Sequence, residues 1–264
     1  MRRILISLAV VLAVLFVALV SLRGAISRPL IFPAPKMRLE VQLPGGSLET
    51  VNSERMAYGY YAPGGKKLIV FFHGNGEVMG SMQDLAATML KEGFSVLLAE
   101  YPGYGYAAEY SVSEQNIYTD CTALVQSVQL KYGHLPTDTI LWGFSLGTGV
   151  AVELAARKQG ERLVLMAPFT SAGDAAEHHF FAAARWLIAD HFDNRAKAPA
   201  ISYPTLIVHG ERDRVLPFKM GQELAGLFPK AALISVADAD HNDLFSLLSP
   251  ADWQDIVRFA KADQ

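Results

Sequence analysis

Six short, wholly apolar runs recur along the chain, and they constrain its fold more than any other feature. Strands of a parallel sheet are buried on both faces, so they read as continuous apolar runs, and a helix-length crossover joins each strand to the next. The spacers here have that length. The pattern therefore predicts an α/β fold with a mostly parallel, doubly wound sheet. We expect strands at 68–72, 95–99, 139–143, 162–167, 205–210 and 232–236, and helices at 80–92, 113–132, 146–158, 217–228 and 243–262.

Two regions lie outside this alternation. Residues 37–43 and 55–61 alternate apolar and polar side chains on either side of Pro44-Gly45-Gly46, which favours an antiparallel opening hairpin. The segment 168–203 contains no strand-like run. We therefore expect it to form a small helical lid over the sheet edge. One catalytic domain is expected over 37–264. The lid candidates for binding an acyl chain, or for ordinary packing, are Phe180, Phe181 and Trp186.

The first residues carry a long apolar segment. Residues 4–22 are apolar except for two serines, and arginines flank them at Arg3 and Arg23. A helix of about 20 apolar residues spans a bilayer core. A cleaved secretory signal is the alternative, with an imperfect cleavage site at 25–27. We therefore expect a transmembrane anchor or signal over 1–27, followed by a proline-rich extended linker over 28–36.

The orientation of this segment follows from its flanks. Basic residues mark the cytoplasmic side of a span, but here they lie on both sides of it. A short charged tail is not readily translocated first, so we expect a single-pass membrane protein with its catalytic domain outside the cytoplasm.

Charge and composition exclude several function classes. The chain has 23 basic and 26 acidic residues and no basic stripe, so it lacks the electrostatic footprint of a nucleic-acid-binding protein. The single cysteine, Cys121, forms no internal disulfide and is expected as a buried thiol in a helix. The seven histidines show no metal-ligand spacing, so neither a metal nor an organic cofactor is expected.

Gly143-Phe144-Ser145-Leu146-Gly147 follows an apolar run and precedes a stretch of small helical residues. This G-x-S-x-G pattern between a strand and a helix is typical of a nucleophile elbow, in which a strained turn exposes the serine hydroxyl. The flanking glycines remove side chains that would clash in the turn. Ser145 is therefore the expected nucleophile.

A serine nucleophile requires a base, and histidine has the suitable pKa. His241 follows the last apolar run, where the chain order Ser, Asp, His places the base in this kind of fold. The acid is expected after the run at 205–210, where both Glu211 and Asp213 occur. We favour Asp213 because it lies nearer the loop apex, directly before the next helix.

The glycine-rich turn at 73–77 follows the first apolar run. Such a turn lets backbone N–H groups point at a developing oxyanion, so the Asn75 and Leu146 amides are the expected oxyanion hole. The alternative is a simple strand-exit turn. Glu77 either closes this loop or is solvent-exposed.

With these parts in place, residues 55–262 resemble the small membrane-anchored α/β-hydrolase-domain proteins, near the serine aminopeptidase and lysophospholipase branch. The resemblance implies the α/β-hydrolase fold, a Ser-His-Asp triad and a lipophilic ester or thioester substrate. Ala107 and Gly76-Glu77 depart from the family's usual residues and put the shape of the pocket in doubt. The motifs that carry the resemblance are His73-Gly74-Asn75, Tyr101-Pro102-Gly103-Tyr104-Gly105, residues 143–147, Ala167-Pro168-Phe169-Thr170-Ser171, residues 209–213 and His241-Asn242.

The residues and the resemblance together predict a serine hydrolase that cleaves an acyl ester or thioester through an acyl-enzyme. Two alternatives stay open: a serine peptidase or amidase, and a non-catalytic scaffold that binds an acylated ligand. Aspartate-nucleophile chemistry, such as epoxide hydrolysis, is disfavoured because Ser145 occupies the nucleophile position.

Overall fold

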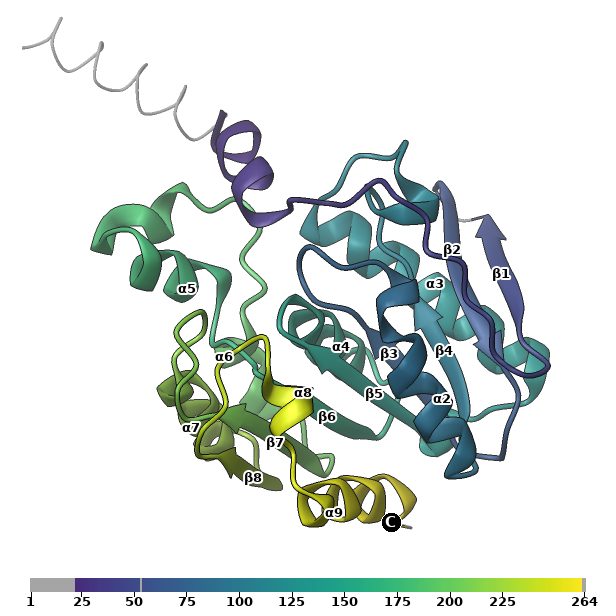
Figure 1. The fold of residues 1–264 in the computed structure, drawn as a ribbon. Helices are drawn as coiled ribbons and strands as arrows, with labels where there is room; N and C mark the ends of the chain where they lie inside the picture. The colour runs from purple at the N-terminus through teal and green to yellow at the C-terminus, as the bar shows by residue number, and fades with distance from the viewer. Residues whose placement is uncertain (1–21, 53, 263–264) are drawn as a thin grey trace, which may run out of the picture.

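The computed structural model describes residues 22–52 and 54–262. Its centre is an eight-stranded sheet with the order β1-β2-β4-β3-β5-β6-β7-β8 (Figure 1). β2 pairs antiparallel with β1 and with β4, and the pairs from β4 through β8 are parallel. The predicted mostly parallel sheet is confirmed. The strands are β1 Ser47–Asn52, β2 Met56–Ala62, β3 Leu68–Phe72, β4 Ser95–Ala99, β5 Thr139–Phe144, β6 Arg162–Met166, β7 Thr205–Gly210 and β8 Ala231–Val236.

Helices cover both faces of the sheet because alternate strand residues point to opposite sides. Leu68, Val70 and Phe72 of β3 pack in one core cluster with α3, α4 and α7, whereas Ile69 and Phe71 pack in a second cluster with α2 and α9. The α-helices are α2 Gln83–Lys91, α3 Glu114–Tyr132, α4 Leu146–Ala156, α5 Ala172–His179, α6 Asn194–Lys197, α7 Phe218–Leu227, α8 Leu244–Leu247 and α9 Pro250–Lys261. Short 3-10 turns are η1 Met79–Met82, η2 Gly105–Ala107, η3 Pro136–Asp138, η4 Ala182–Leu187 and η5 Ala198–Ala200.

Capping residues set the helix ends. Ser113 accepts a hydrogen bond from the Asn116 N–H at the start of α3, and Gly133, at φ 74°, ends that helix in the left-handed region that glycine tolerates. The helix predicted over 243–262 is two helices, because Ser249 forms a capping box with Asp252 and restarts the chain as α9. Cys121 lies buried in α3, as predicted.

The predicted opening hairpin is wrong in its first strand. The turn at 44–45 leads into β1, which begins at Ser47 and pairs with β2, so residues 37–43 form no strand. Their alternation is nevertheless real, because Val41 and Leu43 are buried against the α2 face of the sheet. The alternation of apolar residues over 37–43 therefore reflects the burial of an extended segment that pairs with no strand.

Residues 22–31 are helical, so the predicted extended linker over 28–36 begins only after residue 31. Tertiary packing explains the difference, since Ser27 and Phe32 are buried against the rest of the domain. Most of the predicted membrane segment lies outside the described residues. Among residues 22–52 and 54–262, no helix has the length and hydropathy needed to cross a bilayer.

Candidate active site

Ser145 lies at the turn between β5 and α4, with φ 50°, in a region of backbone conformation that costs energy for a side-chain-bearing residue. The turn is held by its backbone: the Ser145 N–H donates to Met166 O over 2.9 Å, and Thr148 Oγ1 donates to Ser145 O over 2.7 Å. A Cβ on Gly147 would collide with Phe72 O. The glycine therefore allows α4 to approach the end of β3 and aim the serine side chain outward.

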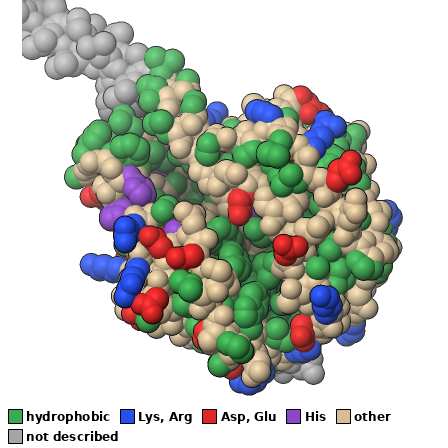
Figure 2. Space-filling model, viewed as in Figure 1, with side chains coloured by type: hydrophobic (Ala, Val, Ile, Leu, Met, Phe, Trp, Pro, Cys, Tyr) green, Lys and Arg blue, Asp and Glu red, His purple; other side chains and the backbone are tan. Residues whose placement is uncertain are grey.

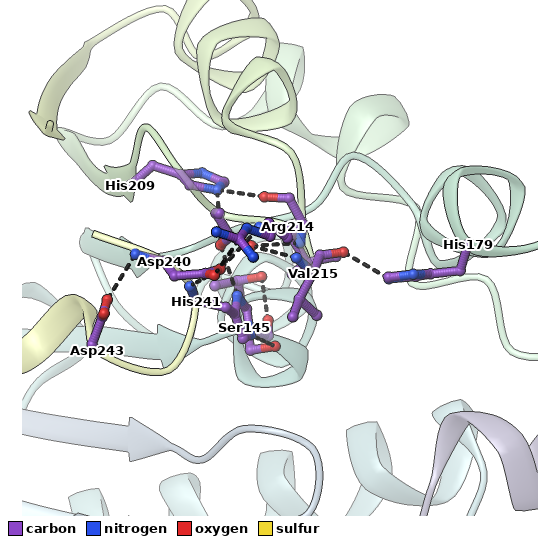
Figure 3. A network of polar contacts seen from close by, with 11 residues as sticks. Ser145, His179, His209, Arg214, Val215, Asp240, His241 and Asp243 are labelled. Carbon is purple, nitrogen blue, oxygen red and sulfur yellow. Dashed lines mark hydrogen bonds and ion pairs between the residues drawn. The ribbon is translucent and has the colours of Figure 1, made fainter. Parts of the chain in front are cut away.

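The structure brings the three predicted site residues into one chain of contacts, of which Figure 3 labels Ser145 and His241. His241 Nε2 lies 2.9 Å from Ser145 Oγ, and His241 Nδ1 lies 2.7 Å from Asp213 Oδ2. The loops after β5, β7 and β8 supply them, all at the carboxyl edge of the sheet. An ionised Asp213 accepts from Nδ1–H, which leaves Nε2 free to accept the serine proton. The His241 ring also stacks on Phe144, with centroids 5.3 Å apart.

The Asp213 carboxylate is buried and fully engaged. Its Oδ1 accepts the Val215 and Leu216 N–H groups over 2.9 and 2.7 Å, and its Oδ2 lies 3.3 Å from His209 Nε2. Burial alone would raise the pKa of this carboxyl, but the hydrogen bonds from His209 and His241 outweigh burial and hold the pKa well below its usual value. The carboxylate therefore stays ionised beside the base.

The other acid candidate, Glu211, is exposed at the start of the same loop. His209 ends an apolar run, and from the sequence it is expected to brace a loop; its contact with the acid was not predicted. It is buried at the end of β7, four residues before Asp213, and its Nε2–H also points at Leu216 O over 2.8 Å. The available signal was its position, since the end of a strand places its side chain beneath the following loop.

The predicted oxyanion residues Asn75 and Leu146 both line the cavity that contains Ser145. Glu77 does close the loop after β3, because its Oε2 accepts the Gly74 N–H over 2.6 Å. Tyr104 OH donates to Asn75 Oδ1 over 3.1 Å and so fixes the Asn75 side chain from outside the loop. Asn75 and Leu146 thus lie at the same cavity as Ser145.

A buried polar layer supports this loop from below. His73 Nδ1 donates to Gly74 O over 2.9 Å, and its Nε2 lies 3.1 Å from Glu100 Oε1. Tyr101 OH donates to His73 O over 2.9 Å, and its ring stacks on the His73 ring. Because each of these groups is partnered and buried, the loop has little freedom to move away from the nucleophile.

The cavity at Ser145 has a volume of about 440 Å³ and mostly apolar walls. Phe180 and Phe181 of the lid line it, and His179 Nε2–H donates to Val215 O over 2.7 Å, which ties the lid to the acid loop (Figure 3). Trp186 is a correction: it is 77% exposed and lies over a separate surface hollow beside Arg185.

The helical residues 22–31 also contribute to the cavity lining, although the sequence predicted an anchor and a linker there. Ile26, Ser27, Leu30 and Ile31 line the same cavity as Ser145 and His241. Within the described part of the chain, no group of three or more His, Cys, Asp or Glu side chains could hold a metal ion.

Known proteins resemble this chain in sequence and in fold. A family model described as serine aminopeptidase, S33, matches residues 64–197. Alpha/beta hydrolase domain-containing protein 17B of Homo sapiens is 31% identical over 185 residues, which are 69% of this chain and 63% of that protein. Protein 17C of Mus musculus is 30% identical over 69% of this chain and 57% of its own length. The matched stretch is thus less than two thirds of these relatives.

Solved structures share the fold at low identity. An esterase of Pyrococcus furiosus superposes with a TM-score of 0.71 at 18% identity, covering 86% of this chain and 96% of its own. An esterase of Exiguobacterium antarcticum superposes with a TM-score of 0.61 at 17% identity, covering 78% and 96%. Together with the family match, these likenesses show that the chain belongs to the α/β-hydrolase superfamily and, within it, to the family described as serine aminopeptidase, S33.

Proposed function

We propose that this protein is a membrane-tethered serine hydrolase that cleaves acyl esters or thioesters. Ser145 is the nucleophile, His241 the general base and Asp213 the acid that orients the base. One observation carries the proposal: a Ser–His–Asp hydrogen-bonded chain, with both contacts under 3 Å, opens into a largely apolar cavity. The esterase titles of the structural neighbours agree with this chemistry.

In the acylation step, His241 Nε2 takes the Ser145 proton as Oγ attacks the acyl carbonyl carbon. The carbonyl oxygen becomes an oxyanion, and the Asn75 and Leu146 N–H groups stabilise it. The protonated imidazole is stabilised by the ionised Asp213, whose pKa lies well below neutral pH. His241 then returns the proton to the leaving alcohol or thiol, and the acyl group stays on Ser145.

In the deacylation step, His241 takes a proton from water, and the hydroxide oxygen attacks the acyl carbonyl. The second tetrahedral intermediate collapses to a carboxylic acid, and Ser145 recovers its proton from His241. The side chains of the triad supply every proton transfer in this scheme.

The cavity walls favour an acyl substrate over a peptide. An aminopeptidase must bind the charged α-amino group of its substrate, for which a carboxylate is the natural partner. The described residues that line this cavity include no Asp or Glu, and its apolar side chains come from both the lid and residues 26–31. An uncharged, lipophilic acyl group matches these walls.

The apolar residues 4–22 support the membrane tether. Their length approaches that of a bilayer span, and they directly precede the helix that lines the cavity. We propose that the catalytic domain lies outside the cytoplasm. Protease treatment of intact cells tests this placement: we expect digestion of the domain, and protection would contradict it.

A fluorophosphonate probe tests the chemistry. We expect the full-length protein to be labelled at Ser145, as located by mass spectrometry, and the Ser145→Ala variant to lose the label. Ser246→Ala is the matched control, because Ser246 is exposed on α8, close in sequence to His241 but outside the cavity lining. Absence of labelling in the folded wild-type protein would contradict the proposal and favour a non-catalytic acyl-binding scaffold.

A further inference from the structure

The helical segment 22–31 is a built part of the cavity at Ser145. Ser27 is 2% exposed, and it lines the cavity together with Ile31. Ile26 and Leu30 also line the cavity, yet they are 48% and 67% exposed, so they form its rim. One helix therefore supplies both the inner wall of the cavity and the edge of its mouth.

Polar contacts lock this helix onto the domain. Arg28 Nε donates to Asp190 Oδ2 over 2.8 Å, and the side chain of Asp190 is only 4% exposed. The same carboxylate accepts the Glu114 N–H over 2.8 Å at the start of α3. The Ala189 N–H donates to Ser27 Oγ over 3.2 Å. A partnered, buried carboxylate is costly to separate from its partner, so the helix has one defined position.

The outer face around this mouth is apolar. Leu22, Ile26 and Leu30 recur every four residues and are all exposed, which places them on one stripe of the helix. Phe180 and Phe181 of the lid, which also line the cavity, are exposed as well. Figure 2 shows hydrophobic side chains gathered where the first described helix meets the lid. We call these five residues the mouth surface; an exposed apolar surface of this kind marks an interaction site.

The sequence indicates what covers the mouth surface. The apolar residues 4–22 end at Leu22, which itself belongs to this surface. If residues 4–22 span a bilayer, the locked helix holds the cavity mouth at the edge of that bilayer. Apolar side chains beside a span bury themselves in the headgroup and acyl boundary.

We therefore propose that the mouth surface docks on the lipid bilayer and that the substrate is a long-chain acyl ester or thioester resident in the membrane. Its acyl chain enters the cavity between residues 26–31 and the lid without crossing water. This proposal rests on the hydrolase function proposed above and adds the substrate's location and route of entry.

The test compares two substrates on the full-length protein in phosphatidylcholine vesicles. One substrate is water-soluble p-nitrophenyl butyrate, and the other is 4-methylumbelliferyl oleate dissolved in the bilayer. The variants are Leu30→Asp at the rim and Leu22→Asp; Leu22 is exposed on the same stripe of the helix but does not line the cavity, so its variant separates the surface from the pocket. Leu130→Asp is the matched control, because Leu130 is 88% exposed near the end of α3 and lines no part of this cavity.

We expect Leu30→Asp and Leu22→Asp each to lower the ratio of oleate to butyrate hydrolysis about tenfold, the factor expected for losing the burial of one large apolar side chain. The ratio for Leu130→Asp should stay within about twofold of wild type. If both variants hydrolyse butyrate and their ratios of oleate to butyrate hydrolysis equal that of wild type, the inference is overturned.

Two other outcomes have distinct meanings. If the wild-type protein hydrolyses neither substrate and takes no fluorophosphonate label, the proposed function itself fails. If light scattering shows that Leu30→Asp and Leu22→Asp turn a dimer into a monomer while the ratios hold, the mouth surface is a contact between two copies, and the bilayer proposal is overturned.

Discussion

The Asp213→Asn substitution tests the proposed role of the acid most directly. The side-chain carbonyl oxygen of the new amide can still accept the Val215 and Leu216 N–H groups, so the loop keeps its shape. The amide nitrogen, however, replaces the oxygen that lies 2.7 Å from His241 Nδ1. An amide N–H donates to Nδ1 there and places the ring proton on Nε2, which can then no longer accept the Ser145 proton.

The size of the effect follows from the lost charge. In the transition state the imidazolium of His241 lies about 4 Å from the carboxylate, and at an effective dielectric constant near 20 this attraction is about 4 kcal/mol. The loss corresponds to about a 1,000-fold drop in kcat/KM. The tautomer change acts in the same direction, so we expect a drop of at least that order for p-nitrophenyl butyrate at neutral pH.

Two matched controls accompany this variant. Asp240→Asn changes the carboxylate that accepts the His241 backbone N–H over 2.8 Å, and Glu211→Gln changes the acid candidate that the structure leaves exposed. Both should keep kcat/KM within about threefold of wild type. A loss below tenfold in a folded Asp213→Asn protein, or an equal loss in either control, would refute the assignment of the acid.

The loop after β3, the nucleophile turn and the buried acid each have a measurable consequence. Glu77→Gln weakens the acceptor of the Gly74 N–H, and we expect kcat on the soluble ester to fall about tenfold with KM little changed; an unchanged kcat would contradict the support role. Gly147→Ala drives a Cβ into Phe72 O and should lower the free energy of unfolding by about 2–3 kcal/mol in urea titrations, whereas a wild-type midpoint would contradict the close approach. Because the folded protein holds the pKa of Asp213 below its unfolded value of about 3.9, the ionised carboxylate stabilises the fold above that pH, and this stabilisation is lost as the pH falls through the folded pKa. The difference in unfolding free energy between wild type and Asp213→Asn should therefore be constant from about pH 5 to 7 and shrink below about pH 4. A difference that stays constant at acid pH would contradict the depressed pKa.

Much of the fold could be read from local patterns. The six predicted apolar runs coincide with β3 to β8, because a strand buried on both faces needs apolar residues at every position. The opening segment shows where such patterns stop being sufficient. Residues 37–43 alternate as a strand would, but Val41 and Leu43 are buried beside α2 with no strand partner. An alternating pattern records which side chains are buried and not what the backbone bonds to.

The candidate site, too, could be predicted from the sequence only in part. The motif around Ser145 and the order of the acid and base loops follow from the chain, because each lies at the carboxyl end of a strand. The roles of His209 and Glu77 depend on contacts that only the structure shows. His209 is a buried second donor to Asp213, and Glu77 accepts the Gly74 N–H and so closes the loop after β3.

The sequence by itself determined the parallel sheet, the residues of the serine turn and the loops that carry the acid and the base, because burial period and turn chemistry act over a few neighbouring positions. Only the tertiary structure decided that four residues of the helix at 26–31 line the cavity and that Trp186 does not. The contact between Arg28 and Asp190 joins positions 162 residues apart. Such contacts depend on how whole elements pack, and no local pattern encodes that packing.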